Sequence, residues 1–174
     1  MTTTNESLQT WESVSERMPE LLKELRCSDL LRRDSRGWLP KDLPKKGVYV
    51  FYGHHKFRGP DKPIYVGRTD RVHDRLREHG QHKATHNKAT FAFILAEEEA
   101  AKCEIVRGSR SRNDFQNDME FKPFFYAAKM RIRDMDFRVV EIPDPIEQAV
   151  FEVYAALVLE TTVPQGGYND FSNH

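Results

Sequence analysis

The stretch from Gly47 to His79 reads GVYVFYGHHKFRGPDKPIYVGRTDRVHDRLREH, and it decides the fold. Its first part, residues 47–52, is a β-branched and aromatic run that is typical of a buried strand. A second apolar run at residues 64–66 follows a segment rich in histidine, glycine and proline, which indicates a second strand joined to the first by a long connection. Residues 70–79 then have helical spacing before Gly80. The predicted order is strand, strand, helix.

The helix predicted at residues 70–79 has an apolar face formed by Val72 and Leu76, which we expect to pack on the sheet. Arg75 and His79, four residues apart, lie on the border of that face. Three other polar residues of the helix are expected to face water: Asp74, Arg77 and Glu78.

These residues resemble the GIY-YIG endonuclease superfamily, which is named after two tripeptides. Here the tripeptides read Gly47-Val48-Tyr49 and Tyr65-Val66-Gly67, Arg75 follows ten residues after the second tyrosine, and His79 follows four after the arginine. The resemblance covers about residues 44–171. It implies an α/β (α+β) fold with a small, mainly antiparallel three-stranded sheet flanked by helices.

The N-terminal residues precede the region of resemblance. We expect residues 1–43 to form a helical extension and linker, and residues 44–174 to form a GIY-YIG-like nuclease domain. Residues 6–33 carry an amphipathic helical pattern that is interrupted or restarted at Pro19. The pattern leaves open whether the extension is a packing cap or a contact surface for substrate or a partner protein.

Three further segments complete the predicted fold. Residues 90–96 are an apolar run that fits a strand or a helix, because periodicity does not decide over so short a length. A helix is predicted to begin near Pro123, and its aromatic residues at helical spacing favour a place in the core over stacking on bases. Residues 137–142 alternate apolar and polar side chains, which predicts the third strand.

The last predicted helix begins after Asp144 and Pro145, an N-cap and first-turn pair that makes Glu147 a capping residue. Ten of the eleven residues at 149–159 are apolar, so we expect this helix to be buried nearly all round, with Glu152 as its only charge. A buried carboxylate costs several kcal/mol unless it is paired, protonated or bound to metal. A divalent cation is one explanation for Glu152, and a salt bridge or a water-facing surface is the other.

The resemblance implies metal-dependent hydrolysis of phosphodiester bonds in DNA. It implies that Glu152 binds Mg²⁺ (or Mn²⁺) and that Arg75 stabilises the charge on the phosphate. Tyr49, helped by Tyr65 and His79, would activate or orient the attacking water, and which tyrosine is the general base stays open.

Charge is distributed unevenly along a chain whose net charge is zero. Residues 41–90 hold 12 Lys and Arg against 5 Asp and Glu, a balance of +7, and six of the seven histidines. A DNA backbone requires such a basic segment over the motif region, although a solvated basic face is the alternative. The predicted substrate-binding residues of this segment are Arg68, Arg71 and Lys83, and the resemblance to the family adds Asn169.

Other function classes find less support in the sequence. The length fits one domain, no apolar run approaches the roughly 20 residues of a membrane span, and residues 1–11 lack the features of a signal peptide. Two cysteines without paired spacing predict a soluble cytoplasmic protein. A metal site at His79, His82 and His86 is disfavoured because Gly80 breaks the helix. A catalytically silent nucleic-acid-binding or protein-interaction module is the remaining alternative.

Overall fold

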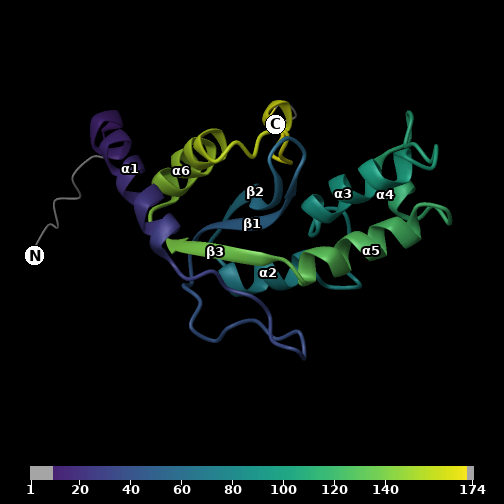
Figure 1. Cartoon of the computed structure of the whole chain (residues 1–174), viewed down its shortest axis with the longest axis horizontal. Coiled ribbons are helices and arrows are strands. Elements are labelled where there is room, and N and C mark those ends of the chain that lie inside the picture. The colour runs from purple at the N-terminus through teal and green to yellow at the C-terminus, as the bar shows by residue number, and fades with distance from the viewer. Residues whose placement is uncertain (1–9, 172–174) are drawn as a thin grey trace, which may run out of the picture.

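The structure, a computed structural model, describes residues 10–171 and contains one antiparallel sheet (Figure 1). The strands β1 (Gly47–His55), β2 (Gly59–Thr69) and β3 (Asp136–Glu141) lie in the order β2-β1-β3. The α-helices of the described chain are α1 (Trp11–Cys27), α2 (Val72–His79), α3 (Thr90–Ala101), α4 (Arg112–Gln116), α5 (Lys122–Arg133) and α6 (Pro145–Val158), and a 3-10 turn, η1, spans Val163–Gln165. This architecture confirms the predicted α/β class with a three-stranded antiparallel sheet and an N-terminal helix.

The hairpin of β1 and β2 is longer than predicted. Instead of a long connection, both strands continue past the apolar runs until His55 pairs with Gly59. Two shifts of register accompany this continuation, one of them where Tyr52 lies opposite Pro63. Because β2 is an edge strand, a proline that cannot donate a ladder hydrogen bond is tolerated there. Because the residues between the two apolar runs are mostly polar, the sequence did not indicate that both strands continue through this segment beyond the core.

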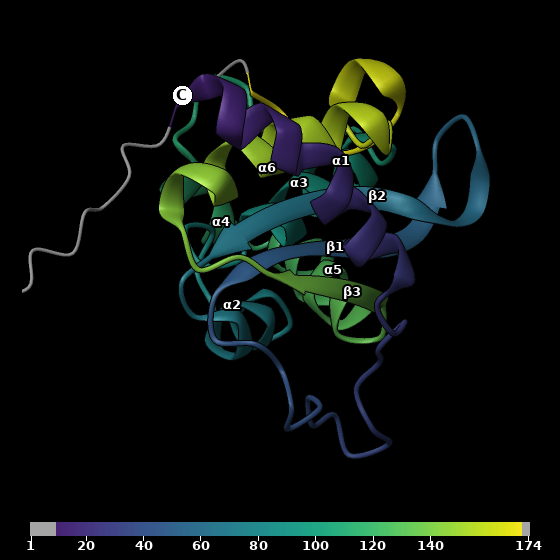
Figure 2. The ribbon, with the colours of Figure 1, turned by 90° about the vertical axis from the view of Figure 1, so that its left-hand side faces the viewer.

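The two faces of the sheet are covered by different helices. Tyr49 and Phe51 of β1 point into a core shared with α2, α3 and α5, whereas Val48 and Val50 point into a second core shared with α1 and α6. Figure 2 shows α1 beside α6 above the strands, with α2 on the other side. The alternation of strand side chains thus builds one core on each face.

The N-terminal helix α1 is part of the fold. It is a single helix that contains Pro19, which is exposed and does not end it. Its buried side chains belong to the core between the sheet and α6: Val14, Met18, Leu21, Leu22 and Leu25. Of the two roles considered for this segment, the packing cap is the one that the structure displays.

The linker that follows α1 pairs with the outer edge of β3 through an isolated antiparallel bridge. The Leu31 amide donates to the Phe137 carbonyl over 2.8 Å, and the Phe137 amide donates back to the Leu31 carbonyl over 2.9 Å. Beyond this bridge the linker runs below the sheet in Figures 1 and 2 before it enters β1.

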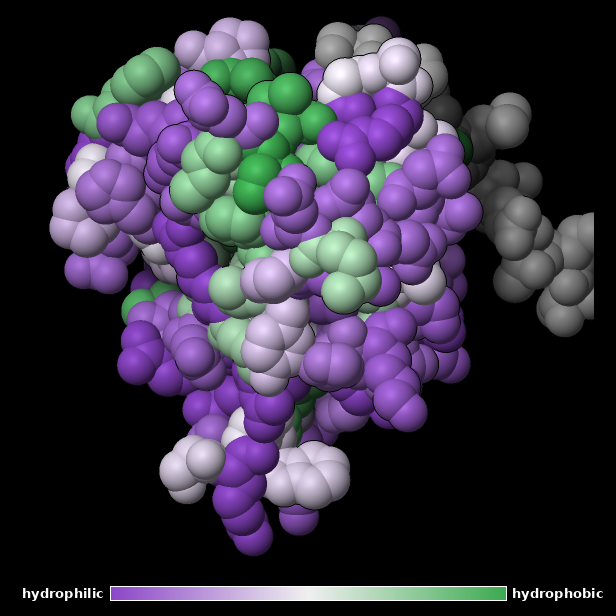
Figure 3. All heavy atoms as spheres, turned by 90° about the vertical axis from the view of Figure 1, so that its right-hand side faces the viewer, coloured by the Kyte–Doolittle hydropathy of each residue, from purple (hydrophilic) through white to green (hydrophobic). Residues whose placement is uncertain are grey.

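The run at residues 90–96 is helical and lies at the start of α3. Its phenylalanines are buried, and Phe93 contacts Phe121 and Phe125 edge to face at centroid distances of 5.2 and 5.5 Å. The aromatic residues at the start of α5 are therefore mainly core, as their spacing favoured. The outer surface on this side is largely hydrophilic, with hydrophobic side chains gathered near its top (Figure 3).

The last helix, α6, starts at the predicted N-cap Asp144 with Pro145 in its first turn, but it is not buried all round. The Asp144 carboxylate accepts from the amides of Ile146 and Glu147, each over 2.8 Å. Only one side of the helix enters the core, so the prediction of complete burial is wrong. The large apolar residues that α6 leaves exposed are Ile146, Val153, Leu157 and Val158. None of the helices within residues 10–171 has the length and apolar character needed to cross a membrane.

The place of α1 in the core can be tested by removing one side chain. Leu21 is 1% exposed, so Leu21→Ala should lower the free energy of unfolding by about 2–5 kcal/mol. Lys23→Ala, two residues away on the exposed side, should change it by less than about 0.5 kcal/mol. Urea unfolding of both variants measures the difference. Equal, small effects would show that α1 is not packed against the sheet in solution.

Candidate active site

The strand register brings the two tripeptide motifs together. Tyr49 on β1 lies opposite Gly67 on β2, so the tyrosine side chain crosses the glycine. A Cβ atom added at Gly67 would collide with the Tyr49 hydroxyl group. Glycine is therefore required here by close approach, and the tyrosine of the first motif and the glycine of the second form one unit.

Helix α2 supplies the partner of this tyrosine. The Tyr49 hydroxyl lies 2.7 Å from Nε2 of His79, and both side chains are buried. Phe51 and Phe91 surround the imidazole edge to face at centroid distances of 5.5 and 6.4 Å. His79 was expected on the border of the helix's apolar face, and the prediction was wrong because these rings extend the core around it.

Burial holds both members of the pair neutral. It raises the pKa of Tyr49 far above its ordinary value, with Tyr65 adding to the shift and Arg75 opposing it. Burial, together with the cations Arg75 and Arg33, holds the pKa of His79 well below 6.5. A neutral imidazole can accept the hydroxyl proton of Tyr49 at Nε2. Its Nδ1 atom then carries hydrogen, and it has no hydrogen-bond partner within the described residues.

Arg75 lies beside both tyrosines and remains within reach of solvent. Its Nη1 donates to the Lys88 carbonyl over 2.8 Å and lies 3.9 Å from the Glu78 carboxylate, and its side chain is 24% exposed. Burial alone would lower the pKa of Arg75, but Tyr49 and Tyr65 outweigh it and the net shift is upward. The guanidinium stays charged and is held from two sides.

Tyr65 is the more accessible of the two tyrosines. It is half-buried and stacks on Phe91 with a centroid distance of 4.3 Å and an interplanar angle of 6°. Burial raises the pKa of Tyr65 to about 12, with Arg75 opposing the shift and Glu152 adding to it. The stacked ring keeps its hydroxyl at the edge where Arg75 and Glu152 also act.

Glu152 faces the same edge from α6. Its carboxylate accepts from Nε of Arg68 over 3.0 Å, and its side chain is 22% exposed. The charge of Glu152 raises the pKa of both Tyr49 and Tyr65, which shows that it acts on the same site. The ion pair and the partial exposure match the salt-bridge alternative considered for this residue, and they leave metal binding as a proposal.

The side chains present suit Mg²⁺ only in a limited way. Within residues 10–171 there is no group of three or more His, Cys, Asp or Glu side chains that could hold a metal ion. Mg²⁺ commonly binds through one or two carboxylates, with waters and substrate phosphate oxygens filling the other positions. Glu152 fits such a site, provided that the bond from Arg68 opens when the ion and the phosphate arrive.

The predicted substrate-binding residues have different surroundings. Arg68 pairs with Glu152, while Arg71 is well exposed, 3.7 Å from Asp74, and Lys83 is exposed in the segment after α2. Asn169 is buried, so its predicted contact with substrate does not fit this structure. Its amide oxygen accepts from the Val66 amide, and its Nδ2 donates to the Val66 carbonyl, each over 2.8 Å.

One supporting residue escaped sequence analysis. Nη2 of Arg33 donates to the carbonyl of Leu76 over 2.6 Å, and its charge contributes to the low pKa of His79. Arg33 lies 43 positions before Leu76 in an irregular linker. No local pattern in the sequence signals a contact of this kind.

Comparisons with known proteins give no match. No protein-family model fits the chain, and searches of curated proteins and of solved structures return nothing similar. The choice of a function therefore depends on these residues and their arrangement.

The neutral state of His79 predicts a specific pH dependence. Below its ordinary pKa of about 6.5, His79 takes up a proton in the unfolded chain but not in the folded protein. Stability should therefore fall as pH drops through that value, with His79 contributing up to about 1.4 kcal/mol per pH unit. His79→Gln offers a polar group to Tyr49 but cannot titrate, so its urea-unfolding free energy should fall less steeply between about pH 7 and 5. Identical slopes would contradict a buried neutral histidine.

Proposed function

We propose that this protein is a divalent-metal-dependent endonuclease that hydrolyses phosphodiester bonds in DNA. The observation that carries the proposal is the convergence of a buried tyrosine–histidine pair, a partly exposed arginine and a carboxylate at one edge of the sheet. A pair able to move a proton, a fixed cation and a metal-compatible carboxylate are the groups that this hydrolysis requires. The resemblance to GIY-YIG nucleases, which rests on the same residues, agrees with it.

The arrangement suggests separate roles for the two tyrosines. Only Tyr49 has a base at its hydroxyl within the described chain, 2.7 Å away. In the proposed mechanism Tyr49 accepts a proton from the attacking water as it gives its own proton to Nε2 of His79. Tyr65, which is more exposed, orients the water. The imidazolium formed at His79 returns its proton through Tyr49 after the products leave.

Arg75 and Glu152 act on the phosphate. The guanidinium of Arg75 neutralises the charge that develops on the non-bridging oxygens as water attacks. Mg²⁺, when bound at Glu152 with the substrate phosphate, supplies Lewis-acid stabilisation of the leaving 3′ oxygen. The products are a 5′-phosphate and a 3′-hydroxyl end, and the leaving oxygen takes its proton from solvent.

A second function, binding of nucleic acid without hydrolysis, is favoured by one contact. The Arg68–Glu152 ion pair places a cation against the proposed metal ligand. If that pair stays closed in the presence of DNA and Mg²⁺, the basic surface binds the strand but the site does not cut it.

The proposed cellular compartment rests on the two cysteines. Cys27 and Cys103 are both exposed and free, and exposed thiols persist in a reducing compartment. We accordingly place the proposed activity in the cytoplasm.

Glu152→Gln tests the metal ligand. The amide keeps the shape of the side chain but removes its charge, so cleavage of plasmid DNA in Mg²⁺ should fall on the order of a hundredfold or more. Affinity for DNA should persist or rise, and stability should stay within about 1 kcal/mol, because Arg68 is half exposed. Glu147→Gln removes the same charge five residues earlier on α6 and should cut normally. Full activity of the Glu152 variant would end the nuclease proposal in this form.

Arg75→Lys separates catalysis from attraction to DNA. Lysine keeps the charge but offers one compact ammonium, so it loses the planar contact with two oxygens. The loss should be on the order of 3 kcal/mol, about a hundredfold in single-turnover cleavage, with little change in DNA affinity measured in Ca²⁺. Arg26→Lys on the exposed side of α1 is the matched control. A parallel loss of affinity and cleavage would instead make Arg75 a simple binding residue.

A further inference from the structure

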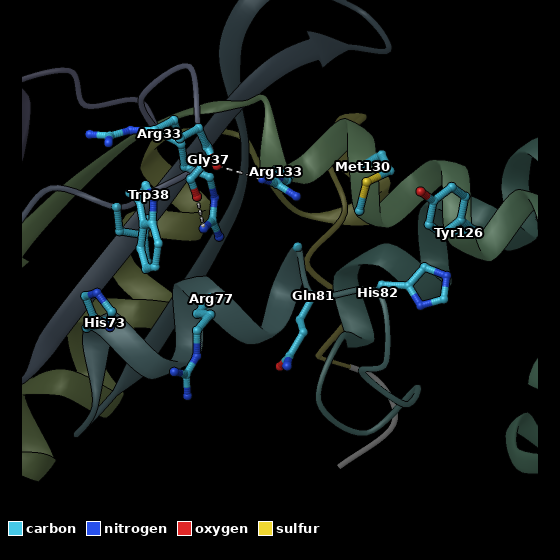
Figure 4. A pocket seen from close by; sticks show the side chains of 13 residues that line it. Arg33, Gly37, Trp38, His73, Arg77, Gln81, His82, Tyr126, Met130 and Arg133 are labelled. Carbon is cyan, nitrogen blue, oxygen red and sulfur yellow. Dashed lines mark hydrogen bonds between the residues drawn. The ribbon is translucent and has the colours of Figure 1, made fainter.

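A basic hollow lies on the other side of α2 from the candidate active site. Its volume is about 400 Å³, and it is bounded by the linker after α1, by α2 and by α5 (Figure 4). Arginine and histidine supply its basic side chains: Arg33, Arg36, Arg77, Arg133, His73 and His82. No acidic residue is among the lining residues of the described chain.

The arginines at the centre of this hollow crowd one another. Arg33 donates to the carbonyls of Gly37 and Leu76, and Arg133 donates to the carbonyl of Arg36 over 3.2 Å. Burial and then the like charge of Arg133 lower the pKa of Arg33 to about 10, with Asp134 opposing the shift. Neighbouring guanidiniums that bond to neutral carbonyls repel each other, and an anion placed between them would relieve the repulsion.

Among the arginines that line the hollow, the ion pairs found in the described residues belong to the outer two, while Asp134 acts on Arg33 without a direct ion pair. Arg36 lies 3.6 Å from Asp34, and Arg77 lies 3.0 Å from Asp74. Both arginines are well exposed, at 80% and 56% of their side chains, so these pairs are weak and open readily to a stronger anion.

Two aromatic side chains bracket the arginines. Figure 4 shows Trp38 at one end of the hollow and Tyr126 at the other, with Arg77 and Gln81 along one side. Trp38 is 68% exposed and also lines a neighbouring hollow of about 790 Å³, so its ring is open to a ligand. Tyr126 is 45% exposed and lies edge to face with His82 at 4.8 Å. Exposed rings beside cations form the combination that binds unstacked bases and their phosphates.

The hollow and the candidate active site use opposite sides of one short helix. Arg75 and His79 lie on the side of α2 that faces the sheet. His73 and Arg77 are each offset from them by two residues, about half a helical turn, and they line the hollow on the opposite side. An α-helix with its side chains is about 10 Å across. A strand that crosses α2 would therefore reach both sites within a few nucleotides.

We propose that this hollow binds a single-stranded segment of nucleic acid, with backbone phosphate held among its four arginines, Arg33, Arg36, Arg77 and Arg133, and bases stacked on Trp38 and Tyr126. The inference deepens the proposed function, on which it rests for the identity of the strand. It assigns the substrate as DNA with an unpaired strand beside the cut, such as a flap or a branch, because bases paired inside a duplex cannot stack on these rings.

The chain contains a built-in probe for this binding. It has two tryptophans, so Trp11→Phe leaves Trp38 as the single indole. Oligothymidylate of about eight nucleotides, titrated in EDTA so that nothing is cut, should quench the fluorescence of Trp38. Blunt duplex of the same length should quench it much less. Polyglutamate, which carries negative charge but no bases, should leave the fluorescence unchanged.

Matched charge variants test the role of the arginines. Arg36→Gln with Arg77→Gln should weaken binding of labelled oligothymidylate on the order of tenfold and lower the salt slope by about 1.4 at most. Lys23→Gln with Arg26→Gln removes the same charge from α1 and should change neither. Trp38→Leu should weaken binding on the order of tenfold. Thermal unfolding confirms that each variant is folded.

The outcomes separate the two proposals. Equal losses in the two double variants, quenching by polyglutamate as strong as by oligothymidylate, or tight binding by Trp38→Leu would each overturn the single-strand site. Cleavage in Mg²⁺ is then compared on flapped and blunt duplexes. If oligothymidylate binds at Trp38 but wild type cuts neither substrate, the nuclease proposal fails while the binding site stands. If wild type cuts both equally, the assignment of an unpaired strand fails while the nuclease stands.

Discussion

The hydrogen bond between Tyr49 and His79 joins the first strand to the helix that follows the hairpin, and the candidate site depends on it. The bond can form only because Gly67 lets the tyrosine cross the neighbouring strand. It lies among aromatic rings, where an unpaired hydroxyl would be costly. The same burial that makes the bond structurally important keeps both groups neutral. Structure and proposed chemistry thus share one contact, and a change that disturbs one is expected to disturb the other.

A second buried contact fixes the opposite side of the site. Asn169, near the C-terminus, pairs with both backbone groups of Val66 and accepts from the Thr161 hydroxyl over 2.8 Å. Its side-chain amide therefore makes the two hydrogen bonds that a neighbouring strand would make with Val66 at the edge of β2. Because Thr161 follows α6 closely, this clamp also limits how far Glu152 can move from Tyr65. A residue expected to meet substrate instead makes buried contacts that join the C-terminal segment to β2.

Sequence patterns predicted the elements of the fold better than their surroundings. Alternating and helical periodicity located the strands and most helices because each pattern records which side of an element is buried. The patterns failed where burial depends on distant segments. The apolar side of α6 is exposed at Leu157 since no other described element covers it, and His79 is buried since Phe51 and Phe91 close over it. The length of the β1–β2 hairpin was underestimated. Its outer part is paired by backbone hydrogen bonds but does not pack on a core, so its side chains show no apolar pattern.

The candidate site shows the same limit. Spacing placed Arg75 and His79 on one helix, the apolar run around Glu152 singled out that carboxylate, and the resemblance added Tyr49 and Tyr65. None of these signals revealed that Arg68 pairs with Glu152. Arg33 also remained hidden, since a linker without periodicity carries no signal for its partners.

If the proposed function holds, the two sides of α2 would serve catalysis and DNA binding separately. Arg75 is held by the Lys88 carbonyl and lies beside two phenols, so its position is fixed before any substrate arrives. Arg77, on the other side, pairs with Asp74 over 3.0 Å in an exposed contact, which leaves its side chain able to move. A fixed cation is suited to charge that develops at one point, whereas a movable cation is suited to a flexible strand. In the proposed function, this eight-residue helix would carry the catalytic residues on one side and strand-binding residues on the other. The chain has no net charge, yet its basic residues are concentrated in residues 41–90. This distribution is explained if both sides of α2 bind the same DNA strand, because positive charge is then needed only along the path of that strand.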